Sequence, residues 1–412
     1  MVDSGNIPVF EDLNTAADYV LAQERSMMSS DPWRQSAGLS RDSHLTPFSS
    51  YFNNAPEDKF IYNSLMSGRF CFKPNLRERK CLFRGQTGFH DPCTPGMFRD
   101  RNQKYFIKES VSYQELYLLI LSHPLVQLMD LGVEIDGSNY QFETNLYGLA
   151  QHYYNKTTLI DLTSDIEVAK FFACCEYHSD TDSYTPIEDE TGQGVLYYYE
   201  IDAQTDFKPG LAPEGVLKKS PLSTIGLQVF PRSGRQKGFL YNLDPGENFN
   251  SVSRLHCVAF KHKADISRNV FAQHNGGAKL LPDDILSDHW LKYYSHIRYL
   301  SENALEVNHR FNANKTIEKL RSELMAAGVR TKFYRPCFTE EELSHYYDES
   351  RDLWRDMWSQ VYIPGDRTNR LLESFMQIPD REEYRWAFEP GHNHSIDYRN
   401  GYLLKRFESC LH

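Results

Sequence analysis

The sequence predicts an α+β fold in which a mixed β-sheet domain is followed by a helical region. Three apolar runs have the length and the aromatic or β-branched content of buried strands: 194–201, 236–242 and 255–260. Further along the chain, apolar residues recur at helical spacing over three segments: 283–303, 312–327 and 340–361. We therefore expect a sheet in the first two thirds of the chain and helices in the last third.

The N-terminal segment has its own pattern. Residues 11–25 predict an amphipathic helix, with Leu13, Ala17, Val20 and Leu21 on one side. Residues 26–58 are rich in Ser, Asp, Asn and Pro, which is typical of a loop or an extended cover. The chain is accordingly divided into an N-terminal helix with its cover, a sheet domain and a helical region, at 1–60, 61–265 and 266–412.

Shorter elements complete the predicted sheet domain. Strands are expected at 80–83 and 159–163, helices at 112–121 and 142–153, and an acidic polar loop at 178–194. A further helix begins near Asp165 and runs through Cys175, with Ser164 or Asp165 as its cap. Its predicted buried face consists of Ile166, Ala169, Phe172 and Ala173.

The helical region carries clear boundary signals. Thr339 and Glu342 form a capping-box pattern, and Gly328 is placed to close the helix before it. Trp290, Trp354 and Trp358 fall on helical faces, and we interpret them as packing residues.

Charge excludes one broad class of protein. The chain has 45 basic and 56 acidic residues and a net charge of −11, which argues against a general nucleic-acid binder but leaves room for a local basic face. Between Arg69 and Arg84 the balance is reversed, since Glu78 is the single acid. This stretch is either a solvated face or a docking face for phosphates.

Compartment and redox state follow from what the sequence lacks. No apolar run approaches the roughly 18 residues of a membrane span, and residues 1–10 lack the features of a secretory signal. The eight cysteines form no C-x-x-C pair and no zinc-type spacing with histidine. We expect a cytoplasmic protein with reduced core thiols and no metal site.

Three motifs occur in a fixed order. The first is Phe83-Arg84-Gly85-Gln86, followed by a Pro and a Phe-Arg at 95–99. The second is Gln151-His152-Tyr153, followed by Leu159-Ile160-Asp161-Leu162-Thr163 and an apolar helix. The third is Arg235-Gln236-x-Gly238-x-Leu240. Together they resemble the FRG domain family over roughly residues 78–245. Asn155-Lys156 and Leu162 depart from the family's usual Leu-Pro and Trp, so we expect a different loop before Asp161.

The motif residues suggest a cleft that binds anions. Arg84, at a strand end, offers a forked donor to a pyrophosphate or carboxylate. Thr163 and Ser164 place hydroxyls at a helix start, where backbone N–H groups favour anions. His152 can orient a group, donate or act as a base. The predicted cleft is lined by Arg84, Gln86, His152, Asp161, Thr163 and Gln236.

The same order of residues resembles the ADP-ribosyltransferases, which implies a split or twisted mixed sheet with NAD as substrate. By this resemblance Arg84 holds the NAD phosphates and nicotinamide ribose, and Thr163 and Ser164 support the nicotinamide pocket. Gln236 then occupies the position of the catalytic Glu. An amide cannot act as a general base, so the acidic role falls to another residue, with Asp161 and Glu200 as the nearest acids, or activity is low, or the pocket only binds.

The sequence is compatible with several alternatives. Arg84 and Asp161 could form a buried ion pair, and Asp161 could serve as a cap or as a partner for His152. The favoured function is an NAD-dependent ADP-ribosyltransferase, as a bacterial toxin or defence effector, whose acceptor is a protein, a nucleic acid or a nucleotide. The alternatives are a non-catalytic nucleotide-binding sensor and a protein whose motifs merely hold the core. Both ligand-binding hypotheses require one cleft that gathers Arg84, His152, Asp161 and Gln236. A protein whose motifs merely hold the core does not require it.

Overall fold

The structure is a computed structural model, and it describes most of the chain between residues 6 and 362. The described residues are 6–30, 56 and 58–362, together with 373, 374, 376 and 377. Within 58–362 the gaps are 66–67, 77, 100–102, 136, 154–155, 179–180, 182, 203–204, 208–209, 212–216, 219, 295–297 and 312–313. No helix in this part of the chain is long and apolar enough to cross a membrane.

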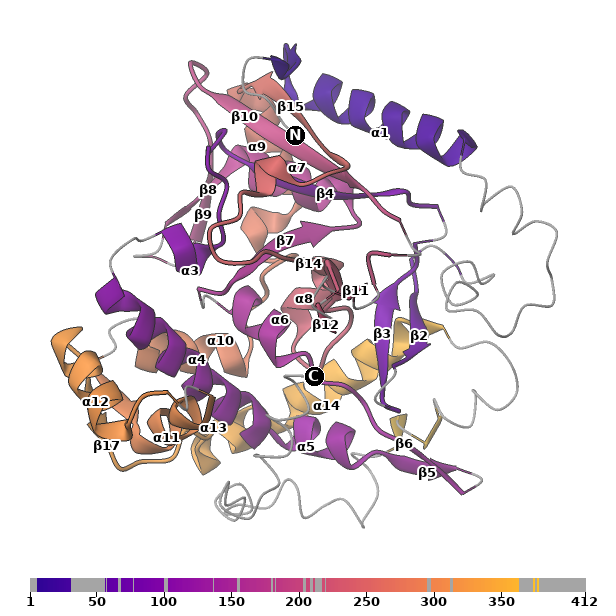
Figure 1. The fold of residues 1–412 in the computed structure, drawn as a ribbon. Coiled ribbons are helices and arrows are strands. Elements are labelled where there is room, and N and C mark those ends of the chain that lie inside the picture. Colours follow the sequence, from indigo (N-terminus) through magenta and orange to yellow (C-terminus); the bar gives the residue numbers. More distant parts are fainter. Residues whose placement is uncertain are drawn as a thin grey trace.

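A mixed seven-stranded sheet forms the upper half of the described structure (Figure 1). The pairing is antiparallel throughout except between the first two strands, which are parallel. Its order is β1 (Val9–Phe10), β15 (Leu255–Lys261), β10 (Gln193–Glu200), β4 (Cys81–Gln86), β7 (Leu159–Thr163), β14 (Gly238–Asn242) and β13 (Leu222–Thr224). The predicted α+β class is confirmed, and the likeness to the ADP-ribosyltransferase fold stays a prediction.

The sheet is weakly joined at its centre. β4 pairs along its length with β10, and β7 pairs along its length with β14. Between β4 and β7, by contrast, the register is a single pair, Phe83 opposite Thr163. The two strands therefore diverge beyond this pair, and the sheet opens there.

Helices α1 (Leu13–Ser30), α7 (Ile166–Cys174) and α9 (Ala264–Gln273) share one apolar cluster with the strands of the sheet. Asp165 caps α7 by accepting the N–H of Glu167 at 3.0 Å, as expected. α7 lies so close to β4 that a Cβ at Gly85 would stand 1.8 Å from the Ala169 carbonyl oxygen. Glycine at this position is therefore a packing requirement of the fold.

The lower half of the structure is a helical lobe built from two distant parts of the chain (Figure 1). Its first part comprises α4 (Gln103–Ser122), α5 (Pro124–Leu131) and α6 (Leu146–His152). Its second part comprises α10 (Ile285–Tyr294), α11 (Glu302–Phe311), α12 (Ile317–Ala326), α13 (Glu340–His345) and α14 (Tyr347–Ser359). One apolar cluster contains residues from both parts, including Trp290, Trp354 and Trp358, which confirms the packing role of these tryptophans.

The other strands of the described chain form small sheets of two or three strands. β2 (Phe60–Ser64) pairs with β3 (Phe70–Pro74) on one side and with β18 (Val361–Tyr362) on the other. The remaining strand pairs are β5 (Val133–Ile135) with β6 (Ser138–Tyr140), β8 (Cys175–His178) with β9 (Ser183–Pro186), β11 (Gly210–Leu211) with β12 (Leu217–Lys218), and β16 (Tyr299–Ser301) with β17 (Arg330–Lys332). The pairing of β18 with β2 joins segments on either side of the boundary predicted at 265–266, and the three-part division stays a prediction.

Several element predictions need correction. The segment 178–194 is not all loop, because β9 pairs back onto β8. Residues 26–30 continue α1, and 283–303 holds α10, β16 and the start of α11. The helix of 142–153 begins only at Leu146, because Asn145 caps it by accepting the N–H of Gly148 at 2.8 Å. In α7 the fully buried ring is Phe171, whereas Phe172 is half-buried.

The strand predicted at 236–242 also starts later. Pro231 begins a short helix, α8 (Pro231–Arg235), and Gln236 is its C-cap. Lys237 follows in the left-handed region with φ 47°, and β14 begins at Gly238. Gln236 therefore closes a helix rather than opening a strand. The capping box at Thr339 and the turn at Gly328 are confirmed.

Candidate functional site

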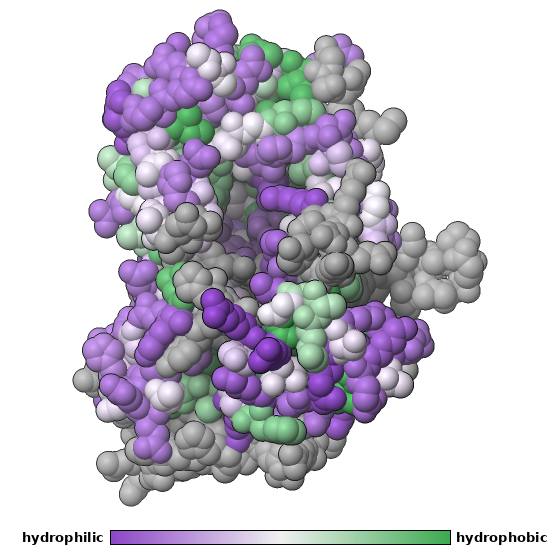
Figure 2. Space-filling view, turned by 90° about the vertical axis from the view of Figure 1, so that its left-hand side faces the viewer, coloured by the Kyte–Doolittle hydropathy of each residue, from purple (hydrophilic) through white to green (hydrophobic). Residues whose placement is uncertain are grey.

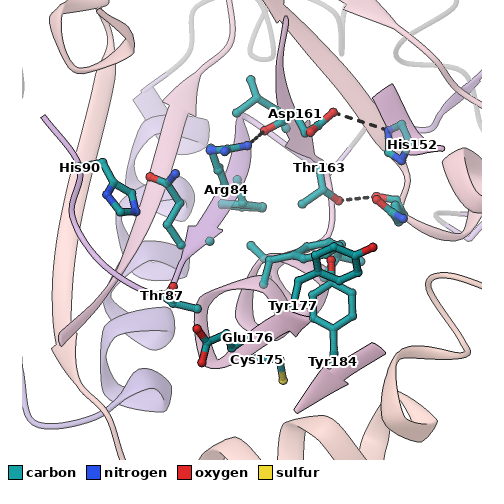
Figure 3. Close-up of a pocket in the computed structure, with 18 of the residues that line it drawn as sticks. Arg84, Thr87, His90, His152, Asp161, Thr163, Cys175, Glu176, Tyr177 and Tyr184 are labelled. Atoms are coloured by element: carbon teal, nitrogen blue, oxygen red, sulfur yellow. Dashed lines mark hydrogen bonds and ion pairs between the residues drawn. The ribbon is translucent and has the colours of Figure 1, made fainter. Parts of the chain in front are cut away.

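A cavity of about 430 Å³ lies where β4 and β7 separate (Figure 3). Its walls come from β4 and the turn after it, α3 (Gly96–Arg99), α6, β7, α7, the β8–β9 hairpin and the end of α8. Figure 2 shows the molecule from the side on which α3 and the hairpin lie, with a hollow at mid-height bordered by hydrophilic residues. The cavity gathers six predicted residues: Arg84, Gln86, His152, Asp161, Thr163 and Gln236.

Arg84 spans the opening of the sheet. Its Nη1 donates to the carbonyl oxygen of Asp161 at 2.9 Å, so the bond goes to the main chain and not to the carboxylate. Asp161 Oδ2 instead accepts from Gln151 Nε2 at 2.7 Å. The considered ion pair between Arg84 and Asp161 is not formed, and Arg84 Nε has no hydrogen-bond partner in the described part of the chain.

His152 faces Asp161 from α6 (Figure 3). The His152 side chain is buried, and its Nε2 lies 3.8 Å from Asp161 Oδ1, which is too long for a hydrogen bond. Burial lowers the pKa of His152, although the Asp161 charge and the neighbouring Gln236 side chain oppose the shift. His152 is therefore neutral near pH 7. Gly238 leaves room for it, because a Cβ there would stand 3.1 Å from Nε2.

Three buried polar atoms converge without partners among the described residues: Arg84 Nε, His152 Nε2 and Asp161 Oδ1. A buried polar atom without a hydrogen bond costs about 1–3 kcal/mol. Native proteins rarely keep several such atoms side by side unless a ligand or water satisfies them. The arrangement therefore provides donors and an acceptor for a polar ligand.

The three residues of the Gln151-His152-Tyr153 motif have different structural roles. Gln151 accepts from the hydroxyl of Thr157 and donates to Asp161, so it holds the loop before β7 in place. Tyr153 is fully buried and donates to Asp284 Oδ2, while the guanidinium of Arg232 lies 4.9 Å from its ring centre. Burial raises the pKa of Asp284 to about 6. Tyr153 thus joins α6 to the second part of the helical lobe, just before α10, while His152 faces the cavity.

The polar groups of Thr163 and Gln236 are engaged within the protein. Thr163 Oγ1 donates to the Gln236 carbonyl oxygen at 2.7 Å and accepts the N–H of Asp165 at 3.0 Å. The Gln236 amide Nε2 donates to the Leu280 carbonyl oxygen at 3.1 Å. Both residues therefore shape the wall of the cavity more than they offer free groups to it.

Two predicted residues lie elsewhere. Ser164 borders a separate, smaller cavity that Arg79 and Lys237 also line. Glu200, considered as a source of the acidic group, ends β10 and lies 3.8 Å from the ammonium of Lys80. It is not among the residues that line the site.

Sequence reasoning missed part of the cavity wall. Arg99 ends α3 beside the site, and its pKa is lowered by desolvation and then by the positive charge of Arg84. Glu176, on β8, brings a carboxylate that has no hydrogen bond or ion pair with any described residue. The Phe-Arg pattern at 98–99 could have indicated Arg99. Nothing indicated Glu176, because it lies between the helix predicted to end at Cys175 and the loop predicted at 178–194.

Aromatic side chains form the far end of the cavity from Arg84. Tyr177 and Tyr184 face each other across the β8–β9 hairpin with ring centres 5.1 Å apart, and Phe172 lies 5.9 Å from Tyr184 (Figure 3). The cavity is thus basic and polar at one end and aromatic at the other. No group of three or more His, Cys, Asp or Glu residues among those described is placed to hold a metal ion.

Fold and site define an α+β protein whose split sheet encloses a polar pocket. The family model of the FRG domain matches residues 79–182, so the chain carries an FRG domain. The match includes the first two motifs, with Arg84, His152 and Asp161, while Gln236 lies outside it. No curated protein and no solved structure gives a significant match to the chain.

Proposed function

We propose that the cavity of the FRG domain binds a dinucleotide of the NAD type and that the protein acts as an ADP-ribosyltransferase. The observation that carries the proposal is the convergence of Arg84 Nε, His152 Nε2 and Asp161 Oδ1, buried and without partners among the described residues. A ribose hydroxyl both donates and accepts, so it can satisfy an unpaired carboxylate oxygen and an imidazole nitrogen together.

The two ends of the cavity suit the two kinds of group in a dinucleotide. Arg84 and Arg99 lie close enough for one charge to lower the pKa of the other, and a pyrophosphate would relieve this repulsion. Phe172, Tyr177 and Tyr184 offer ring faces on which a planar base can stack. A volume of about 430 Å³ lies within the range of roughly 300–1,000 Å³ typical of ligand pockets.

Transfer of ADP-ribose needs a negative charge near the reacting ribose. The bond between nicotinamide nitrogen and ribose C1′ breaks, nicotinamide leaves with the electron pair, and an acceptor attacks C1′ and loses its proton to a base. A carboxylate stabilises the cationic ribose in between. Gln236 has no carboxylate and its amide is engaged with Leu280. We assign this role to Glu176, with Asp161 as the other acid of the cavity.

A second candidate function is nucleotide binding without catalysis. It is favoured by Gln236, which stands where the ADP-ribosyltransferase resemblance expects an acid. In this reading the same ligand occupies the cavity, and the helical lobe, joined to it through Tyr153 and Asp284, carries the signal. Roles as a toxin or a defence effector stay predictions.

One experiment separates these functions. Calorimetric titration with NAD and ADP-ribose measures binding, and chromatography of an incubation with NAD measures nicotinamide release. We expect wild type to bind both and to release nicotinamide, and Glu176→Gln to bind equally but release none. Glu188→Gln is the matched control, because Glu188 is exposed and pairs with Arg268 outside the cavity. Binding without release supports the sensor function, and absence of binding contradicts both.

A further inference from the structure

The outer face of a small sheet in the helical lobe combines exposed rings with exposed cations. β16 and β17 run parallel, with Tyr299 opposite Arg330 and Ser301 opposite Lys332. Their inner face is occupied, because Leu300 is buried and the Thr331 hydroxyl donates to Glu302. Side chains alternate along a strand, so Arg330 and Lys332 share the opposite face. The Lys332 ammonium lies 3.5 Å from the ring centre of Tyr299, which places that ring on the same face.

Aromatic exposure is the first argument for a docking surface. Phe333, directly after β17, is 92% exposed, the largest value among the exposed hydrophobic residues of the described chain. Tyr334 is 39% exposed and Tyr299 is 40% exposed. Contiguous exposed apolar groups of this kind mark interaction sites in soluble proteins, whereas single ones do not.

The same surface also carries positive charge that is unpaired in the described part of the chain. Arg298, Arg330 and Lys332 are exposed, and none of them forms an ion pair with a described acid. Glu302, the acid beneath the sheet, is held by Arg321 at 2.8 Å and by Thr331. The chain as a whole has a net charge of −11, so this face is positive although the protein is acidic overall.

We propose that this basic-aromatic surface, formed by Tyr299, Arg330 and Lys332 on the outer face of the two strands and by the exposed Arg298, Phe333 and Tyr334 directly beside them in the chain, binds single-stranded nucleic acid. Unpaired bases stack on exposed rings, and the phosphates between them bind cations interleaved with those rings. A duplex keeps its base faces hidden, and an acidic peptide would use the cations but leave Phe333 without a partner. The inference does not depend on the function proposed for the cavity.

The position of the face adds a geometric relation. β17 lies on the left-hand side of the helical lobe in Figure 1, the side on which α3 and the β8–β9 hairpin flank the cavity. In this view β17 and the elements that flank the cavity therefore lie on the same side of the molecule.

Fluorescence anisotropy with labelled single-stranded oligothymidylate and oligouridylate tests the proposal on the full chain. We expect binding that weakens steeply between low and physiological salt. Phe333→Ala should weaken it about 5- to 100-fold, the range found for loss of one stacked base. Arg330→Ala combined with Lys332→Ala should lower the slope of log affinity against log salt by about 1.4, or about 0.7 per phosphate contact.

Two control variants remove comparable side chains elsewhere on the surface. Phe106→Ala removes another exposed ring, and Lys263→Ala with Arg268→Ala removes two exposed cations outside the face; both should bind like wild type. Thermal melting of each variant shows that it is folded. The proposal is overturned if wild type does not bind at low salt, or if Phe333→Ala binds as tightly. It is also overturned if duplex DNA binds equally well, or if polyglutamate competes as strongly as the oligonucleotide.

Discussion

Arg84 Nη1 donates to the main-chain carbonyl oxygen of Asp161 at 2.9 Å, across the point where β4 and β7 cease to pair. A side-chain hydrogen bond thus joins the two strands at the point where their main-chain pairing stops. The bond holds the opening of the sheet at a defined width, and it uses only one nitrogen of the guanidinium. The arginine of the Phe-Arg-Gly-Gln motif can therefore stabilise the split and still present Nε to a ligand.

Replacing Arg84 by Lys keeps the positive charge at this position but removes the planar geometry of the guanidinium. A single ammonium cannot bond the Asp161 carbonyl and a ligand oxygen with the spacing of a guanidinium. We expect the affinity for ADP-ribose to fall about 10- to 100-fold, as for loss of a charged hydrogen bond of roughly 1.5–3 kcal/mol. Calorimetry measures this, with the exposed Arg268→Lys as control. Unchanged affinity in Arg84→Lys would remove Arg84 from the binding site.

Gly85→Ala should destabilise the fold. The new Cβ would meet the Ala169 carbonyl oxygen at 1.8 Å and Ala173 N at 2.7 Å, so α7 must move off β4. We expect the free energy of unfolding to fall by about 3 kcal/mol, at the upper end for overpacking. Urea denaturation measures it. Gly88→Ala is the matched control, because its nearest neighbour would be Gln193 O at 3.9 Å, and a change within about 0.5 kcal/mol is expected there.

Tyr153→Phe should destabilise the protein in a pH-dependent way. Burial raises the pKa of Asp284 to about 6, above its unfolded value, so wild-type stability already declines as pH rises through about 4 to 6. The Tyr153 hydroxyl donates to this carboxylate and favours its charged form. Without this hydroxyl we expect the free energy of unfolding to be about 1–3 kcal/mol lower than that of wild type at pH 8. The difference should become smaller below pH 6. Urea denaturation at both pH values measures the difference, and a deficit independent of pH would contradict this account.

Asp161→Asn should lower the pKa of His152 further. Burial already lowers it, and the Asp161 charge is what opposes the shift most. Removing that charge leaves burial less opposed, so the imidazole should titrate at lower pH in the variant. Because the unfolded histidine binds protons near pH 6.5, stability should also fall more steeply below that pH. NMR titration of the His152 ring protons in both proteins measures the change, and an unchanged His152 titration would contradict this account.

Local sequence signals predicted the elements that do not depend on distant partners. The capped helix after Asp165, the strands at 159–163, 194–201 and 255–260, and the capping box at Thr339 all occur. The motifs also predicted which residues meet, since Arg84, His152, Asp161 and Gln236 line one cavity. These features follow from short-range chemistry, namely capping hydrogen bonds, side-chain alternation and apolar runs.

The tertiary structure decided what each motif residue can do. Sequence alone assigned Gln236 to a strand and a catalytic position, whereas it is the C-cap of α8, directly before the turn at Lys237, and its side-chain amide donates to the Leu280 carbonyl oxygen. Glu176 faces the cavity only because β9 pairs back onto β8. Ser164 is next to Thr163 in the chain yet borders another cavity, because β7 ends at Thr163 and Ser164 lies in the bend that follows. The sequence determined which chemical groups were present, and long-range packing determined which of them still had unused hydrogen-bonding capacity.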